Sequence, residues 1–101
     1  MPAPRSRAAD VFGRRVREAR IALAMSQEDI ANLADMHVTN YGRIERGEAN
    51  SELHTIVRIA TALDVDPAVL MAGLYGTAML PDRSRAYSVA DFIAAKRAHE
   101  Q

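Results

Sequence analysis

Apolar residues recur at intervals of three and four along most of this 101-residue chain, the spacing that places them on one side of an α-helix. The first helix is expected from Asp10, as its N-cap, to about Ala24. Its apolar stripe is formed by Phe12, Val16, Ala19 and Leu23. Residues 1–8 show no such period and include two prolines, which predicts a flexible basic arm.

Two short helices should follow close together. Ser26 and Asp29 have the spacing of a capping box, which marks the start of the second helix. The segment 35–37 interrupts the pattern, and a third helix is expected from Val38 to about Arg46, ended by Gly47 at the C′ position. The inward positions of the two helices are Ile30, Leu33, Ala34, Tyr41 and Ile44.

Three further helices are expected downstream. Leu53 to Leu63 carries the fourth stripe, and Asp66-Pro67 opens a fifth helix anchored by Leu70 and Leu74. Glycines and prolines over 73–82 indicate a break, and Ser88 opens a sixth helix to about His99. No alternating strand pattern is present. The pattern predicts an all-α fold, with a five-helix domain over 9–74 and a short C-terminal helical extension over 75–101.

Composition narrows the functional class. Apolar residues make up 49% of the chain and cysteine is absent, so a packed core is expected and disulfides and thiolate metal sites are excluded. The start lacks the apolar run of a signal peptide, and no stretch reaches the length of a membrane span. We expect a cytoplasmic protein. No nucleophile–base pair, phosphate loop or metal cluster is visible, so neither an enzyme nor a cofactor is expected.

For nucleic-acid binding, the distribution of charge along the chain is more informative than the net charge. The formal net charge is zero, which by itself argues mildly against nucleic-acid binding. Residues 1–25, however, hold six arginines against two acidic residues, and a second basic cluster lies near the C-terminus. The basic residues are therefore concentrated at the two ends of the chain.

Ser26 to Arg46 meets the requirements of a helix-turn-helix, in which two short helices cross at a fixed steep angle through a short turn. A small residue is needed where the helices approach, and Ala31 supplies it. The first turn residue must tolerate a left-handed backbone, and Asp35 does so better than a β-branched residue.

The sequence resembles the phage-repressor or Cro-like helix-turn-helix family, also called the xenobiotic-response-element family, from Phe12 to Leu74. The matching residues are Arg17, Arg20, Ser26-Gln27-Glu28, Ile30-Ala31, Ile44-Glu45-Arg46-Gly47, Ile59-Ala60, Leu63 and Val65. Three positions depart from the family pattern. Asp35 replaces a common turn glycine, Ser51 replaces a common loop proline, and Gly42 lies inside the recognition helix.

The resemblance implies that the helix from Val38 enters the major groove of DNA. Its outer face would reach base edges, with Arg43 placed for a bidentate contact to guanine. Gly42 either lets the helix backbone approach the bases or is tolerated without effect. The candidate base contacts are His37, Val38, Thr39, Asn40, Gly42 and Arg43, and the candidate phosphate contacts are Arg14, Arg17, Gln27, Arg46, Asn50 and Ser51.

Arg20 and Glu45 match a pair that in this family forms a largely buried ion pair, so we expect them to stabilise the fold. The sixth helix either packs on its own core or mediates dimerisation, and dimerisation is favoured because one helix-turn-helix reads only a few base pairs. The candidate dimerisation residues are Leu70, Leu74, Val89, Phe92 and Ile93.

The predicted function is that of a sequence-specific transcriptional regulator, most often a repressor, which binds a palindromic operator in double-stranded DNA as a homodimer. The resemblance implies a bacterial or phage origin. It leaves open phage repressors, restriction–modification controllers and antitoxins. The alternative is a protein-interaction module, such as an antitoxin, whose C-terminal helix binds a partner protein.

Overall fold

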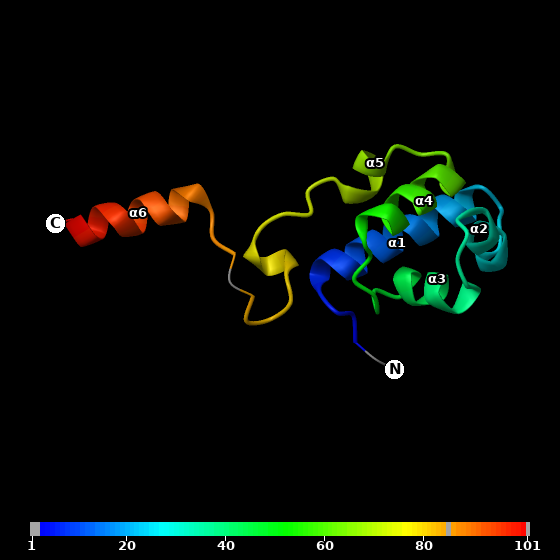
Figure 1. The fold of residues 1–101 in the computed structure, drawn as a ribbon, viewed down its shortest axis with the longest axis horizontal. Helices are drawn as coiled ribbons and strands as arrows, with labels where there is room; N and C mark the ends of the chain where they lie inside the picture. Colours follow the sequence, from blue (N-terminus) through cyan, green and yellow to red (C-terminus); the bar gives the residue numbers. More distant parts are fainter. Residues whose placement is uncertain (1–2, 85, 101) are drawn as a thin grey trace.

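The computed structural model describes residues 3–84 and 86–100, and every regular element in these ranges is a helix (Figure 1). The predicted all-α fold is confirmed. The elements are α1 (Arg7–Ala22), α2 (Gln27–Leu33), α3 (Val38–Glu45), α4 (Leu53–Leu63), α5 (Pro67–Met71), the 3₁₀ helix η1 (Thr77–Met79) and α6 (Val89–Glu100). No helix among the described residues combines the length and apolar character needed to cross a membrane.

The start of α1 differs from the prediction. Ser6, not Asp10, is the N-cap, because its side chain accepts a hydrogen bond from the Ala9 amide at 3.0 Å. Asp10 instead lies in the first turn and forms an ion pair with Arg14. The helix therefore includes residues 7 and 8, which were expected in a flexible arm, and residues 1–2 lie outside the described part of the chain.

The turn between α2 and α3 follows the prediction. Ser26 and Asp29 form the reciprocal capping box, and Asp35 adopts the left-handed conformation with φ of 55°. The Met36 amide bonds back to the Ala31 carbonyl at 3.0 Å. From α4, the Arg58 Nε donates to the Ala34 carbonyl at 3.1 Å, which fixes the end of α2. These contacts fix the angle between α2 and α3.

The core lies between α1, α2, α3, α4 and α5, and its largest fully buried side chains are Tyr41, Ile30, Ile59, Leu63, Leu70 and Val16. Three expectations are corrected here, and the first is Leu33, which was expected to point inward but is 68% exposed. Leu70 is only 1% exposed, so its side chain is a core residue and not available to a second subunit. Leu23 follows the end of α1 and is 45% exposed, so it does not complete the apolar stripe.

Beyond α5, Leu74 still packs against the core and η1 contacts α1, whereas α6 lies away from the helix-turn-helix domain (Figure 1). Ser88, the predicted start of this helix, forms a reciprocal pair of capping hydrogen bonds with Asp91. All twelve residues of α6 are exposed, including Val89, Phe92 and Ile93. The alternative in which the sixth helix packs back on its own core is thus not the arrangement found.

Candidate DNA interface

Helix α3 has one buried and one exposed face. Tyr41, Ile44 and Glu45 are buried against the other helices, whereas the remaining side chains are open to solvent. The exposed residues at its start and along its outer face are His37, Val38, Thr39, Asn40 and Arg43. Five of the six candidate base contacts therefore lie together on the exposed face of a helix whose opposite face is anchored in the core.

Gly42, the sixth candidate, lies on the other side. It is buried, and a Cβ at this position would lie 3.1 Å from Arg46 Nη1 and 3.5 Å from Gln27 Oε1. The missing side chain gives room to these two long polar groups rather than to a base. We therefore correct the assignment of Gly42 as a base contact.

A groove beside α3 extends the exposed face toward the loop that precedes α4. Its lining includes Asn40 and Arg43 from α3, Asn50 from the loop, and Arg5 from the N-terminal segment. Arg46 makes an ion pair with Glu48, and this pairing neutralises one of the loop carboxylates. The groove lining thus combines amide and guanidinium groups, the kinds of side chain that contact phosphates and base edges, with the carboxylates of Asp35, Glu48 and Glu52.

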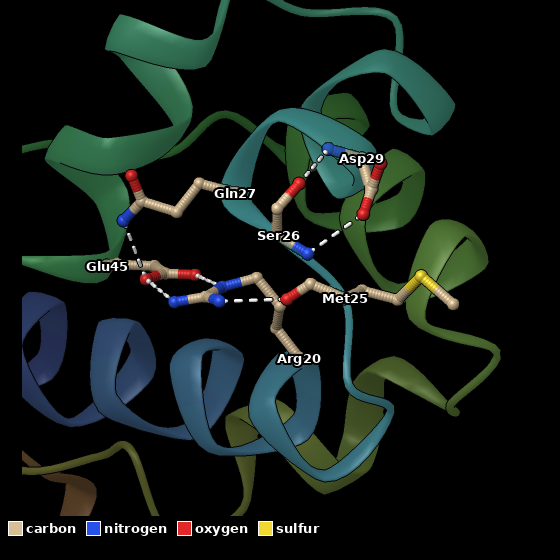
Figure 2. A network of polar contacts seen from close by, with 6 residues as sticks. All are labelled: Arg20, Met25, Ser26, Gln27, Asp29 and Glu45. Atoms are coloured by element: carbon tan, nitrogen blue, oxygen red, sulfur yellow. Dashed lines mark hydrogen bonds and ion pairs between the residues drawn. The ribbon is translucent and has the colours of Figure 1, made fainter.

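Behind the exposed face, Arg20 and Glu45 form a bidentate pair (Figure 2). The Arg20 Nε lies 2.7 Å from Glu45 Oε2, and Nη2 lies 3.0 Å from Oε1. Arg20 also donates to the Met25 carbonyl at 2.9 Å, and the Gln27 amide donates to Glu45 Oε1 at 2.9 Å. The network joins α1, the start of α2 and α3, and so holds α3 in a fixed orientation.

The protonation of Glu45 reflects this environment. Burial favours the neutral acid and raises the pKa of Glu45, but the hydrogen bonds from Arg20 and Gln27, together with the nearby Tyr41 hydroxyl, lower it by more, so its pKa lies below the ordinary value. The hydrogen bond to Glu45 likewise raises the pKa of Arg20, against the opposing effect of burial. Burial also raises the pKa of Tyr41. The pair is therefore ionised at neutral pH.

The candidate phosphate contacts do not form one uniform set. Asn50 and Arg17 are exposed, whereas Arg14 and Arg46 are exposed but already paired with Asp10 and Glu48. The Gln27 amide is bonded to Glu45. The Ser51 hydroxyl oxygen is buried and has no hydrogen-bond partner among the described residues, so its assignment as a phosphate contact is corrected.

Several residues that position the interface were missed from the sequence. Gly13 lies where α1 crosses α3, and an added Cβ would be 2.2 Å from the Ile44 carbonyl oxygen. Arg15 Nη1 donates to the Leu70 and Ala72 carbonyls at 3.1 and 2.7 Å and ties α5 to α1. Arg58 fixes the end of α2. Each acts on a residue distant in sequence, and local periodicity carries no signal for such contacts.

Comparison with known proteins agrees with this geometry. The sequence model of the helix-turn-helix family HTH_3 matches residues 16–70. The chain is 42% identical over 62 residues to the control protein C.BamHI of Bacillus amyloliquefaciens, covering 60% of this chain and 76% of that protein.

Solved structures of helix-turn-helix regulators are also similar to this chain. The restriction–modification controller protein C.AhdI from Aeromonas hydrophila is 42% identical, with a TM-score of 0.60 over 61% of this chain and 94% of that chain. The clp gene regulator ClgR from Corynebacterium glutamicum shares the fold over 96% of this chain and 87% of its own, with a TM-score of 0.64 at 15% identity. The chain belongs to the helix-turn-helix family HTH_3 of DNA-binding transcription regulators.

Proposed function

We propose that the chain is the transcriptional controller of a restriction–modification system and that it binds a two-fold symmetric operator as a homodimer. The observation that carries the proposal is the exposed face of α3, on which His37, Val38, Thr39, Asn40 and Arg43 lie together above a buried ionic network. The 42% identity to C.AhdI, over 94% of that chain, favours a restriction–modification controller over a phage repressor.

The residues of α3 have separable roles in this proposal. Arg43 is exposed in the last turn, and its planar guanidinium matches the N7 and O6 acceptors of guanine. Asn40 can pair with adenine, while Val38 and the Thr39 methyl group pack against thymine methyl groups. Arg17, Asn50 and Arg46 contact phosphates and fix the register, with Arg46 exchanging its bond to Glu48 for one to DNA. Arg14 and Gln27 also contact phosphates, after Arg14 breaks its ion pair with Asp10 and Gln27 breaks its hydrogen bond to Glu45.

Arg43→Ala should weaken binding to the preferred operator by about 1–3 kcal/mol and relax the preference at one base position in each half-site. Arg46→Ala should instead weaken binding to DNA of every sequence to a similar extent, because a phosphate contact carries no base information. Titration of both variants against the operator and its single-base variants measures the difference. Equal loss of affinity across all sequences for Arg43→Ala would contradict its role as a base reader.

Dimerisation is assigned to α6, with a contribution from Leu74. Val89, Phe92 and Ile93 are 74%, 63% and 42% exposed and lie on one side of a helix that is too short to be stable alone in water. An isolated apolar stripe of this kind is stabilised when a second copy of the chain covers it. This places two recognition helices in one particle, as reading of two half-sites requires.

Ile93→Glu should raise the dimer dissociation constant at least about tenfold, because it places a charge in the apolar stripe. Ala98→Glu is the matched control, since Ala98 is exposed on the opposite side of the same helix. Sedimentation equilibrium measures both variants. A wild-type monomer, or an unchanged dimer in Ile93→Glu, would contradict this assignment, and α6 would then be examined for binding to a different protein.

A further inference from the structure

The N-terminal segment before α1 is fixed to the DNA-binding domain at three successive residues. The Arg5 amide donates to the Gly47 carbonyl oxygen at 2.8 Å, and Ser6 caps α1. Pro4 lies so close to Gly47 that a Cβ on the glycine would come within 3.1 Å of Pro4 Cβ. Gly47 also has φ of 75°, so glycine is needed there both for the turn after α3 and for the seat of this segment.

This anchoring brings the Arg5 side chain to the proposed interface. Arg5 is exposed and lines the groove that also contains Asn40, Arg43 and Asn50. The N-terminal segment lies on the same side of the domain as α3 (Figure 1). With α3 docked in the major groove as proposed, this segment beside the loop after α3 would face the flanking DNA backbone.

The charges around the groove leave Arg5 available for a ligand. Arg58 is held by the Ala34 carbonyl and the Thr55 hydroxyl, and Arg46 is paired with Glu48. Within the described part of the chain, the guanidinium groups of Arg5 and Arg43 take part in no ion pair or hydrogen bond. The groove lining also includes the carboxylates of Asp35, Glu48 and Glu52. Glu48 is paired with Arg46, and among the described residues no carboxylate forms an ion pair with Arg5 or Arg43.

We propose that Arg5 is an additional DNA contact and that it binds a backbone phosphate beside the major groove read by α3. The inference rests on the proposed docking of α3. A guanidinium binds phosphate with two parallel hydrogen bonds, and the ordered backbone at Arg5 lowers the entropy lost when this contact forms. The DNA-binding surface thus extends from α3 and its loop onto the segment that precedes α1.

The test is the salt dependence of operator binding by wild type, Arg5→Ala and Arg7→Ala. Arg7 is the matched control because it is exposed on the first turn of α1 and does not line the groove beside α3. Arg5→Ala should reduce the slope of log K against log salt by about 0.9 for each bound subunit. Arg5→Lys should retain most of this slope, and Arg7→Ala should behave as wild type. The Arg5 backbone bond to Gly47 persists in all variants, so thermal unfolding should be unchanged.

Including Arg43→Ala separates the two proposals. If Arg43→Ala relaxes base preference while Arg5→Ala keeps the wild-type salt slope, the Arg5 inference is wrong and the docking of α3 stands. If Arg43→Ala also behaves as wild type, the docking of α3 is wrong. A changed base preference in Arg5→Ala, rather than a uniform loss of affinity, would overturn the assignment of Arg5 to phosphate.

Discussion

Gly13→Ala is expected to destabilise the folded protein by at least about 3 kcal/mol, at or above the upper end of the usual cost of overpacking. The added Cβ would lie 2.2 Å from the Ile44 carbonyl oxygen and 2.7 Å from that of Glu45. Both neighbours are backbone atoms of α3, so the clash is relieved only if α1 and α3 move apart. Thermal unfolding followed by circular dichroism should show a melting temperature lower by at least about 12 °C.

Gly42→Ala is the matched control for this substitution. Its Cβ would meet the flexible end of Arg46 at 3.1 Å, and alanine gains about 1 kcal/mol over glycine inside a helix. We expect a stability close to wild type or slightly above it. If Gly13→Ala melted at the same temperature as Gly42→Ala, the close crossing of α1 and α3 would be wrong.

Glu45→Ala is the second substitution with a large expected effect, about 3–5 kcal/mol of lost stability. The Glu45 side chain is 1% exposed and that of Arg20 is 13% exposed, so the substitution leaves a mostly buried guanidinium without its anion. The amide of Gln27 loses its acceptor as well. Urea unfolding measures the change, and Glu28→Ala, at an exposed position in α2, is the control. Wild-type stability in Glu45→Ala would show that the pair does not hold the fold.

The same pair predicts a dependence on pH. The pKa of Glu45 is lower in the folded protein than its ordinary value, so the ionised carboxylate stabilises the fold above the ordinary pKa of about 4.5. This contribution should be lost as the pH falls toward the lower pKa of the folded state. Glu45→Gln removes the titrating group, so its urea midpoint should fall less steeply with acid than that of wild type.

Local features of the fold were predictable because their causes lie within a few residues. The Ser26–Asp29 capping box, the left-handed Asp35 and the Asp66-Pro67 helix start are each encoded by adjacent side chains. The N-cap of α1 was wrong by four residues because Ser6 and Asp10 are both good caps, and only the contacts of the whole segment decide between them.

Contacts between distant segments were less predictable. The packing of α1, α3 and α5 decides on which side of α3 Gly42 lies and whether Leu70 is buried. It also decides the roles of Gly13 and Arg15, and the sequence of one helix does not contain this information. The exposed face of α3 was predictable in outline because Tyr41 and Ile44 identify the buried side. Arg5 was missed because its place depends on contacts of the N-terminal segment with Gly47, which is distant in sequence.

Selection of bound sequences from a random duplex library tests the central claim most directly. A dimer that docks α3 in the major groove should enrich a two-fold symmetric motif whose half-sites lie about 10 base pairs, or one helical turn, apart. The Arg43→Ala protein should enrich the same motif with one base position per half-site relaxed. A folded wild-type protein that enriches no motif, or a motif unaffected by Arg43→Ala, would contradict operator reading through α3.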